Sequence, residues 1–225
     1  RGAGVSVSSN STDAERDASA QSGGGIETFT SGGFTIEQGT SNNNNQNNNN
    51  SNYVAWAWDA ADSTSTNNAG ATQSQVRVNS TSKFSIVKWT NPSGSTTVGH
   101  GLGVKPEVIF TKGLGSCEWQ VYHESIGNNY KLYLDGDNAR VSSSVWGTTD
   151  PTATLFTFDD NRTQDFIAYC FKSVDGYSSF GSYNAVTANS VYPFVYTGFR
   201  PAWVMHKRYD SGGTNVGDWR IWDSK

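Results

Sequence analysis

Hydrophobic and polar positions alternate along this chain in short runs, the period of a β-strand rather than of a helix. Six such runs between Phe84 and Phe171 cover residues 84–89, 108–112, 119–122, 131–134, 156–158 and 166–171. Glycine, proline, asparagine and aspartate separate the runs and are typical of turns. This spacing predicts an all-β fold, and specifically β-sandwich modules of short antiparallel strands.

The pattern occurs twice. Residues 103–112, followed by Trp119, reappear as residues 198–207, followed by Trp219. The offset is 207 − 112 = 95 for the lysines and 219 − 119 = 100 for the tryptophans, so a longer loop precedes the second tryptophan. Other blocks keep the same order: residues 34–37 match 156–159, 53–58 match 166–171, and 84–85 match 177–178. Such internal similarity indicates tandem modules.

The repeat sets the expected domain boundaries. We predict an extended or flexible lead-in over residues 1–25, the end of a preceding module over 26–58, a linker over 59–82 that contains a short alternating strand over 75–78, a first β-sandwich module over 83–172, and the incomplete start of a second module over 173–225. The parent chain is expected to continue beyond this sequence.

Three local features are predicted in the first 58 residues. A hairpin is expected between residues 26 and 37, turning at Gly32-Gly33. Residues 53–58 are expected to form a central strand, with Trp56 and Trp58 on one face and small residues on the other. The asparagine-rich tract 41–52 is predicted to be a solvated loop, with an intermolecular asparagine ladder as the alternative.

Composition agrees with this fold and narrows the partners. Charged residues make up only 16% of the chain, whereas tryptophan, tyrosine and phenylalanine, which fill pleated faces, occur 8, 10 and 11 times. The net charge of −4 argues against a nucleic-acid or anionic-membrane partner, since either would require a basic face. No apolar run approaches the roughly 20 residues needed to cross a bilayer.

The titratable residues show no catalytic or metal-binding pattern. His100, His123 and His206 lack metal-site spacing, and none faces a histidine in the other copy, so they are interpreted as structural or exposed. Cys117 and Cys170 do not occupy matching positions, so two buried thiols are expected, with a disulfide as the alternative.

The acids of sandwich-fold glycosidases alternate along one strand, and no such run is present. Asp135-Gly136-Asp137 is interpreted as a turn, or as half of a weak calcium loop. No catalytic, cofactor-binding or metal residue is therefore predicted, and the protein is expected not to be an enzyme.

One repeated set of side chains remains as a possible ligand or assembly surface: Lys112, Trp119, Tyr122, Lys207, Trp219 and Trp222. Flat rings of this kind can stack on sugars. Alternatively, Trp119 and Val121 point into the core while Lys112 extends along the edge. Occurrence in both copies favours the core interpretation, because duplication preserves the requirements of folding more surely than one binding specificity.

Several blocks together resemble a known family: residues 53–58, 84–87, 99–106, 119–123, 166–171, 181–183, 196–202 and 219–225. They are similar to a β-rich tandem-repeat family of tail-fibre-like and other virion structural proteins of marine bacteriophages, notably those of cyanobacteria. Members often carry the module next to a concanavalin-like lectin domain. The resemblance covers about residues 26–225 and implies a virion or extracellular location. It supplies no catalytic or ligand residues, and the asparagine tract departs from it.

The resemblance implies a fibre or spike that attaches a phage to its host through many weak contacts. The expected partners are further copies of the chain, in a trimer by analogy with tail fibres, other virion proteins and a host-surface glycan. The alternative is a capsid decoration protein, head fibre or extracellular filament subunit, in which modules bind one another and residues 1–25 order against neighbours. A polysaccharide depolymerase is a third alternative.

Overall fold

The computed structural model describes residues 2–17, 24–38, 47, 51–186, 192–210 and 217–224. Within them the fold is all-β, with one short 3-10 helix, η1 (Glu124–Ile126). The strands are β1 (Val5–Ser6), β2 (Arg16–Asp17), β3 (Gly24–Thr30), β4 (Gly33–Gln38), β5 (Ser65–Asn67), β6 (Ser74–Asn79), β7 (Phe84–Thr90), β8 (Gly94–Gly99), β9 (Val108–Gly113), β10 (Gln120–His123), β11 (Tyr130–Tyr133), β12 (Val141–Ser142), β13 (Leu155–Asp160), β14 (Asp165–Phe171), β15 (Trp203–His206) and β16 (Arg220–Asp223).

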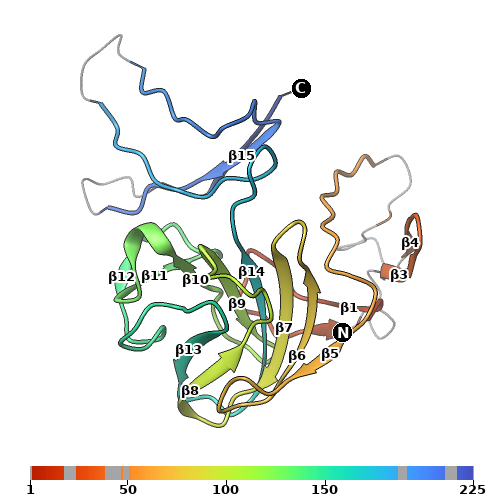
Figure 1. Cartoon of the computed structure of the whole chain (residues 1–225). Coiled ribbons are helices and arrows are strands. Elements are labelled where there is room, and N and C mark those ends of the chain that lie inside the picture. The colour runs from red at the N-terminus through yellow and green to blue at the C-terminus, as the bar shows by residue number, and fades with distance from the viewer. Residues whose placement is uncertain are drawn as a thin grey trace.

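Residues 59–172 form the central module, a β-sandwich. Its larger layer is an antiparallel sheet in the order β12-β11-β10-β9-β14-β7-β6-β5, and β13 pairs with β8 in a second sheet (Figure 1). Side chains from both sheets meet in one core cluster, which includes Val87 and Phe166 from the large sheet and Val98 from β8. The predicted sandwich is therefore confirmed.

Aromatic rings fill this core. The Trp89 ring stacks on Phe166 at 5.5 Å between centroids and meets Phe156 and Phe158 edge to face at 5.6 and 5.2 Å. Such offset and perpendicular arrangements are those that ring quadrupoles favour. Cys170 is fully buried beside them, and both cysteines are free thiols, as predicted.

The six strands predicted in the complete module are all present, but the predicted linker 59–82 is not a linker throughout. β5 and β6 continue the large sheet beyond β7, and Val76 of β6 is 4% exposed in the core. With only two apolar positions, β6 gives a weak pattern by itself, and its place in the large sheet comes from backbone pairing with β7. β6 itself agrees with the short strand predicted over residues 75–78, whereas β8, rich in glycine and threonine, was not predicted.

The opposite face of the large sheet carries a second apolar cluster. Val108, Val121, Ile126 and Leu132 are buried there. Side chains from beyond the central module pack against them, including Phe180, Tyr209 and Trp219. This face is therefore where the C-terminal residues attach.

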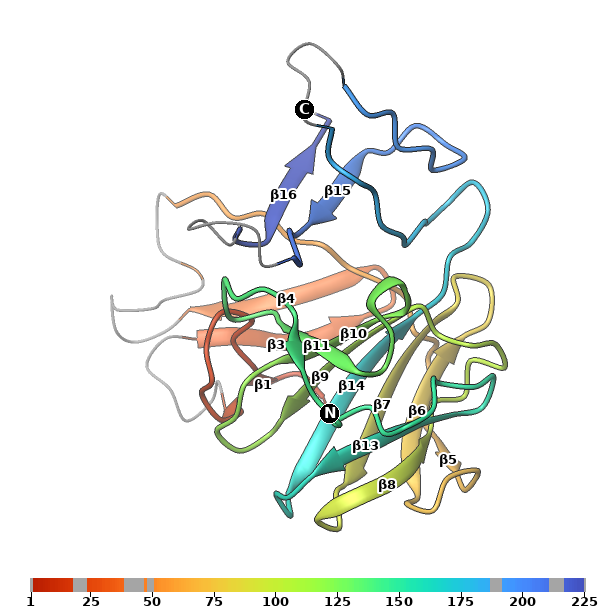
Figure 2. The same ribbon diagram turned by 90° about the vertical axis from the view of Figure 1, so that its left-hand side faces the viewer.

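The remaining strands form three separate pairs, β1–β2, β3–β4 and β15–β16. β15–β16 stands apart from the sandwich in two perpendicular views (Figures 1 and 2). The predicted hairpin over 26–37 is confirmed as β3–β4, in which Thr30 pairs with Gly33. No helix in the described part of the chain is long and apolar enough to cross a bilayer.

Residues 53–58 do not form the predicted strand. They are extended and exposed, with Trp56 at 52% and Trp58 at 46% exposure. Their counterpart β14 lies between β7 and β9, which supply hydrogen bonds on both edges. Within the described part of the chain, residues 53–58 form no ladder of backbone hydrogen bonds with another strand, so pattern alone does not make them a strand. Most of the asparagine tract lies outside the described residues.

Candidate functional site

Lys112 of β9 is a fully buried cation. Its Nζ lies within hydrogen-bond distance of five backbone carbonyl oxygens: Asp13 (2.7 Å), Cys117 (2.8 Å), Gly113 (3.2 Å), Thr12 (3.4 Å) and Gly115 (3.5 Å). Burial lowers the pKa of Lys112. The prediction that this lysine extends along an edge is wrong, because two of the carbonyls come from a distant segment that covers it.

That segment is β1–β2 with its loop, residues 5–17, which lies in the predicted extended or flexible lead-in. Glu15 N donates to Leu114 O at 2.8 Å, and Cys117 N donates to Thr12 O at 2.9 Å. The hairpin is therefore held by the loop that follows β9. The hairpin and its docking were not predicted, because the hydrogen bonds join backbone atoms and leave no hydrophobic period in the sequence.

Trp119 also binds the β1–β2 hairpin. Its ring is 5% exposed and stacks on Tyr169 at 6.2 Å, as the core interpretation predicts. Its indole Nε1 donates to Ser8 O at 2.7 Å. The tryptophan is therefore a buried residue that also holds the β1–β2 hairpin by a hydrogen bond.

The second copy repeats this arrangement on a different hairpin. Lys207 Nζ donates to Gly136 O at 3.1 Å and to Gly217 O at 2.9 Å, and burial lowers its pKa. Trp219 Nε1 donates to Tyr133 O at 2.7 Å. The Lys207 ammonium also lies 5.8 Å from the centre of the Trp219 ring.

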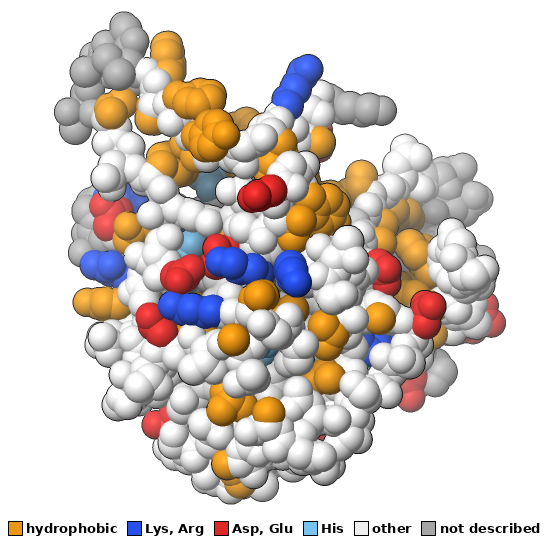
Figure 3. Space-filling view, in the orientation of Figure 1, with side chains coloured by type: hydrophobic (Ala, Val, Ile, Leu, Met, Phe, Trp, Pro, Cys, Tyr) orange, Lys and Arg blue, Asp and Glu red, His pale blue; other side chains and the backbone are white. Residues whose placement is uncertain are grey.

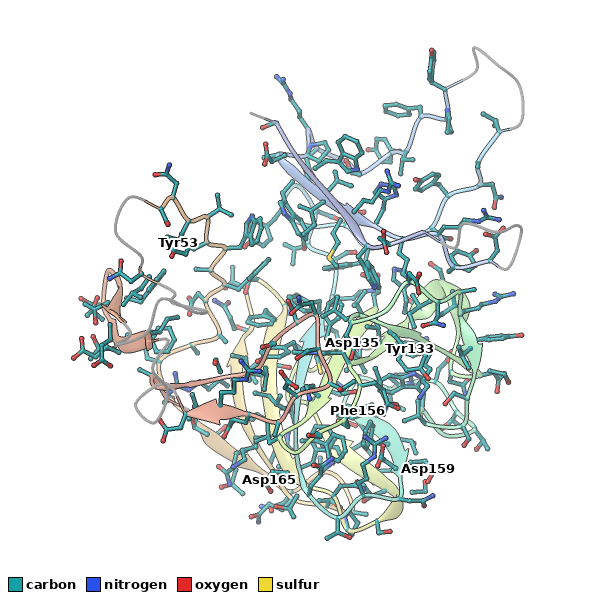
Figure 4. All side chains as sticks on the ribbon, turned by 180° about the vertical axis from the view of Figure 1, so that it is seen from behind. Tyr53, Tyr133, Asp135, Phe156, Asp159 and Asp165 are labelled. Atoms are coloured by element: carbon teal, nitrogen blue, oxygen red, sulfur yellow. The ribbon has the colours of Figure 1, made fainter. Side chains whose placement is uncertain are left out.

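The hairpin bound there is β11–β12 of the central module. Arg140 N donates to Tyr209 O at 2.9 Å. Arg140 directly precedes β12, so this hydrogen bond fixes the end of the loop that leads into that strand. Tyr133 and Asp135 lie on the side of the sandwich that faces β15–β16 (Figure 4). The loop between the two strands therefore joins the central module to the C-terminal residues.

The two sites agree in register on the strand side. Ile109 pairs with Tyr122 in β9–β10, and Val204 pairs with Trp222 in β15–β16. The offsets 204 − 109 = 95 and 222 − 122 = 100 are those of the sequence repeat.

The hairpin side agrees equally well. Val5 pairs with Asp17, and Tyr130 pairs with Ser142, so both strands are displaced by 125 residues (130 − 5 and 142 − 17). The indole acceptors Ser8 and Tyr133 differ by the same 133 − 8 = 125. One docking site, a lysine and a tryptophan that hold the hairpin of another module, therefore occurs twice.

The other two members of the predicted surface lie outside this site. Tyr122 is fully buried, with its ring 5.8 Å from Trp146. Trp222 is 59% exposed and donates from Nε1 to His206 Nε2 at 3.0 Å. Since Trp119 is covered by the hairpin, the structure does not bring these rings together as one sugar platform.

Charged side chains support the first site. Glu118 lies 3.2 Å from Arg162 and 3.5 Å from Lys131. Burial would raise the pKa of Glu118, but these cations and backbone hydrogen bonding lower it. Asp135 accepts a hydrogen bond from Trp119 N at 3.2 Å. These contacts fix β10 and its tryptophan in position.

The histidines are structural. His100 is fully buried, accepts from Leu102 N through Nδ1 and contacts Thr152 O through Nε2, each at 3.2 Å. Burial lowers its pKa to about 4. His123 Nδ1 accepts from Ser125 N at 3.1 Å. In the part of the chain that the structure describes, no three histidine, cysteine or acidic residues gather where they could hold a metal.

Comparison with known proteins identifies a family without an assigned activity. The family model described as a domain of unknown function, DUF7483, matches residues 1–225. No curated protein and no solved structure matches the chain.

Proposed function

Since the chain belongs to the DUF7483 family, we propose its function from the docking site: it is a non-enzymatic structural component of a bacteriophage fibre or spike. The observation that carries the proposal is the lysine–tryptophan site that recurs in both copies and binds a neighbouring module's hairpin. A site used twice for the same backbone contacts is what a chain of joined modules requires.

The chemistry of the site suits a permanent joint. Every acceptor described above for the Lys112 ammonium and the Trp119 indole is a backbone carbonyl, so the joint tolerates changes of side chain in the hairpin. Separating the hairpin from Lys112 and Trp119 breaks hydrogen bonds to buried groups. Any of these groups that stays shielded from water is then left without a partner, which makes separation of the two modules costly. This favours an architectural role, in which modules fix one another in place.

The virion location comes from the resemblance to phage fibre proteins, and self-association with other virion proteins belongs to the same proposal. Attachment to a host-surface glycan is the second candidate function. Most of the central module's surface in Figure 3 is backbone or side chains that are neither charged nor hydrophobic, with a group of charged side chains across its upper part, and backbone and uncharged polar groups can hydrogen-bond to sugar hydroxyls. Copies displayed side by side would multiply weak contacts of this kind.

The location is tested by immunoelectron microscopy of purified phage particles from the source, with antibody against residues 59–172. We expect label on a fibre, spike or capsid surface. Particles that contain the protein by mass spectrometry but carry label only after disruption would contradict a surface role. Absence of the protein from purified particles would contradict the virion assignment.

The two candidate roles are separated by a glycan array probed with the purified chain. Glycan binding would favour attachment, whereas a particle that loses its fibre when the protein is absent would favour architecture. Turnover of host-surface polysaccharide by the purified chain would contradict both, because it would show a depolymerase.

A further inference from the structure

Exposed apolar side chains are concentrated outside the central module. Of the 18 exposed large hydrophobic residues in the described part of the chain, 17 lie in the N-terminal segment, residues 2–58, or the C-terminal segment, residues 173–224. The exception is Val141. Figure 3 shows such side chains on the upper part of the molecule and where it meets the sandwich. So large an exposed apolar surface indicates an interface.

The matching positions in the central module are buried. Phe34 and Ile36, 38% and 37% exposed, match Phe156 and Phe158, which are 1% and 0% exposed. In the C-terminal segment, Val204 and Trp222 are 40% and 59% exposed. Their counterparts Ile109 and Tyr122 are fully buried. The exposed residues are therefore core residues of a module that is not closed.

The two segments carry complementary sets of strands. In the N-terminal segment, β1–β2 matches β11–β12, β4 matches β13 (33 + 122 = 155), and residues 53–58 match β14. In the C-terminal segment, β15–β16 matches β9–β10. One segment thus holds late strands of a module and the other holds earlier strands.

Their contacts reproduce a pair of the complete module. Trp58 matches Phe171 (58 + 113), and Trp203 matches Val108 (203 − 95). Phe171 and Val108 are partners in the β14–β9 ladder. The Trp58 and Trp203 rings lie 6.4 Å apart, edge to face, and Trp56 also lies 6.4 Å from Trp203. Residues 53–58 therefore already lie beside β15, where β14 lies beside β9.

The docking is reciprocal. The β1–β2 hairpin of the N-terminal segment binds the central module, and the β11–β12 hairpin of the central module binds the C-terminal segment. In addition, Trp58 contacts its own counterpart Phe171, with ring centres 6.3 Å apart. Reciprocal contacts, and contact between equivalent residues, are the marks of a two-fold relation.

We propose that the N-terminal and C-terminal segments are two halves of one second module, which closes within the same chain and pairs with the central module about an approximate two-fold axis. Residues 53–58 take the place of β14 next to β15, and β4 and the C-terminal segment bury each other's apolar side chains. The gain is burial of apolar surface, which is favourable in proportion to the area removed from water. The inference concerns the fold and holds whether or not the protein belongs to a virion.

The test is a disulfide placed by the repeat. In the central module, Cys170 of β14 pairs with Ile109 of β9. The repeat matches Cys170 to Ala57 (170 − 113) and Ile109 to Val204 (109 + 95). In the double variant Ala57→Cys, Val204→Cys, Cα atoms paired across a ladder fall within the reach of a disulfide. The matched control, Ala55→Cys with Val204→Cys, is two residues out of register, roughly 7 Å along the strand.

We expect a bond between positions 57 and 204 within one chain, mapped by mass spectrometry in dilute protein, and little or none in the control. A bond between two chains would overturn the proposal, because a second copy would then supply the missing half. Equal bonding in both variants would also overturn it, since the segments would share no register. Failure of both to bond would do the same.

Amide hydrogen exchange of the unsubstituted chain tests the proposal even if a cysteine variant does not fold. Amide hydrogen exchange should be slowed for residues 53–58, because a strand paired with β15 protects its amides. Exchange in this stretch as fast as in an unfolded peptide would overturn the closed module.

Discussion

At the scale of single residues, Lys112 is unusual because its ammonium is fully buried. A buried ammonium is costly unless it is hydrogen-bonded, and here backbone carbonyls replace water. Gly113 beside it is required for space, since a Cβ there would lie 2.4 Å from Gln164 Nε2 and 2.6 Å from Cys117 Sγ. The loop that presents the carbonyls is therefore as closely specified as the lysine.

Lys112→Met should destabilise the protein by about 2–3 kcal/mol, because it leaves buried carbonyls without donors. The measurement is urea unfolding followed by tryptophan fluorescence. Lys88→Met serves as control, since Lys88 makes a surface ion pair with Asp165 at 2.9 Å and should cost no more than about 1 kcal/mol. Equal losses in the two variants would show that the carbonyl cage contributes nothing.

His100 should make stability depend on pH. Burial holds its pKa at about 4 in the folded chain, against 6.5 for an unperturbed histidine. Between these values the unfolded state binds a proton that the folded state does not, so stability falls as the pH drops from 6.5 to 4. The loss attributable to this group is about 3 kcal/mol.

The check is His100→Gln, which retains polar groups but does not titrate. Unfolding free energies at pH 6.5 and 4 should differ less in the variant than in the unsubstituted chain. At pH 8.5, two units above the unperturbed pKa, His100 is neutral in both states, so any difference between the proteins there reports packing alone. An unchanged pH slope in the variant would contradict the assignment.

At the scale of elements, the hairpin is the unit that joins modules. β1–β2 and β11–β12 have different side chains but the same register and the same position for the carbonyl that accepts the indole hydrogen bond. Each is too small to be stable alone, because a two-stranded hairpin in water is marginal. Both are therefore ordered by the lysine and tryptophan that receive them.

Trp119→Phe and Trp219→Phe form a matched pair that tests this. Each removes one indole donor and should weaken its own joint by about 1–2 kcal/mol. By amide exchange, Trp119→Phe should expose the Glu15 amide and leave the Arg140 amide protected, whereas Trp219→Phe should do the reverse. If either substitution exposes both amides, the two joints are not independent.

At the scale of the whole molecule, the central module contains a complete core. The main cluster, from Val76 to Cys170, lies entirely within residues 59–172. Both segments outside it contribute contacts to its outer face and to the docking sites. The central module is therefore the folding unit, and the segments depend on it.

Residues 59–172 expressed alone should unfold cooperatively in a single thermal transition, measured by circular dichroism, but at a lower Tm than the full chain. The reduction follows because Lys112 and Trp119 lose the carbonyls of residues 8–13. Residues 173–225 alone should show no such transition. An isolated central module without cooperative unfolding would place part of its core outside these boundaries.

How much of this was predictable differs between parts of the chain. Alternating apolar positions and repeated blocks determined the all-β class, the duplication and most central strands, since side-chain burial leaves a period in the sequence. They also marked Lys112, Trp119, Lys207 and Trp219 as one repeated set. The strand predicted over 53–58 and the linker predicted over 59–82 failed where pairing, rather than pattern, decides the outcome.

The sequence by itself therefore determined which residues can be buried and that they occur twice. Only the tertiary structure decided what the repeated lysine and tryptophan hold, because their acceptors are backbone carbonyls. Every residue has a carbonyl, so no residue type records that Ser8 and Tyr133 occupy the same place. The residue type specifies the chemistry of a side chain, whereas the hydrogen-bond partner of a backbone carbonyl is decided only when the chain folds.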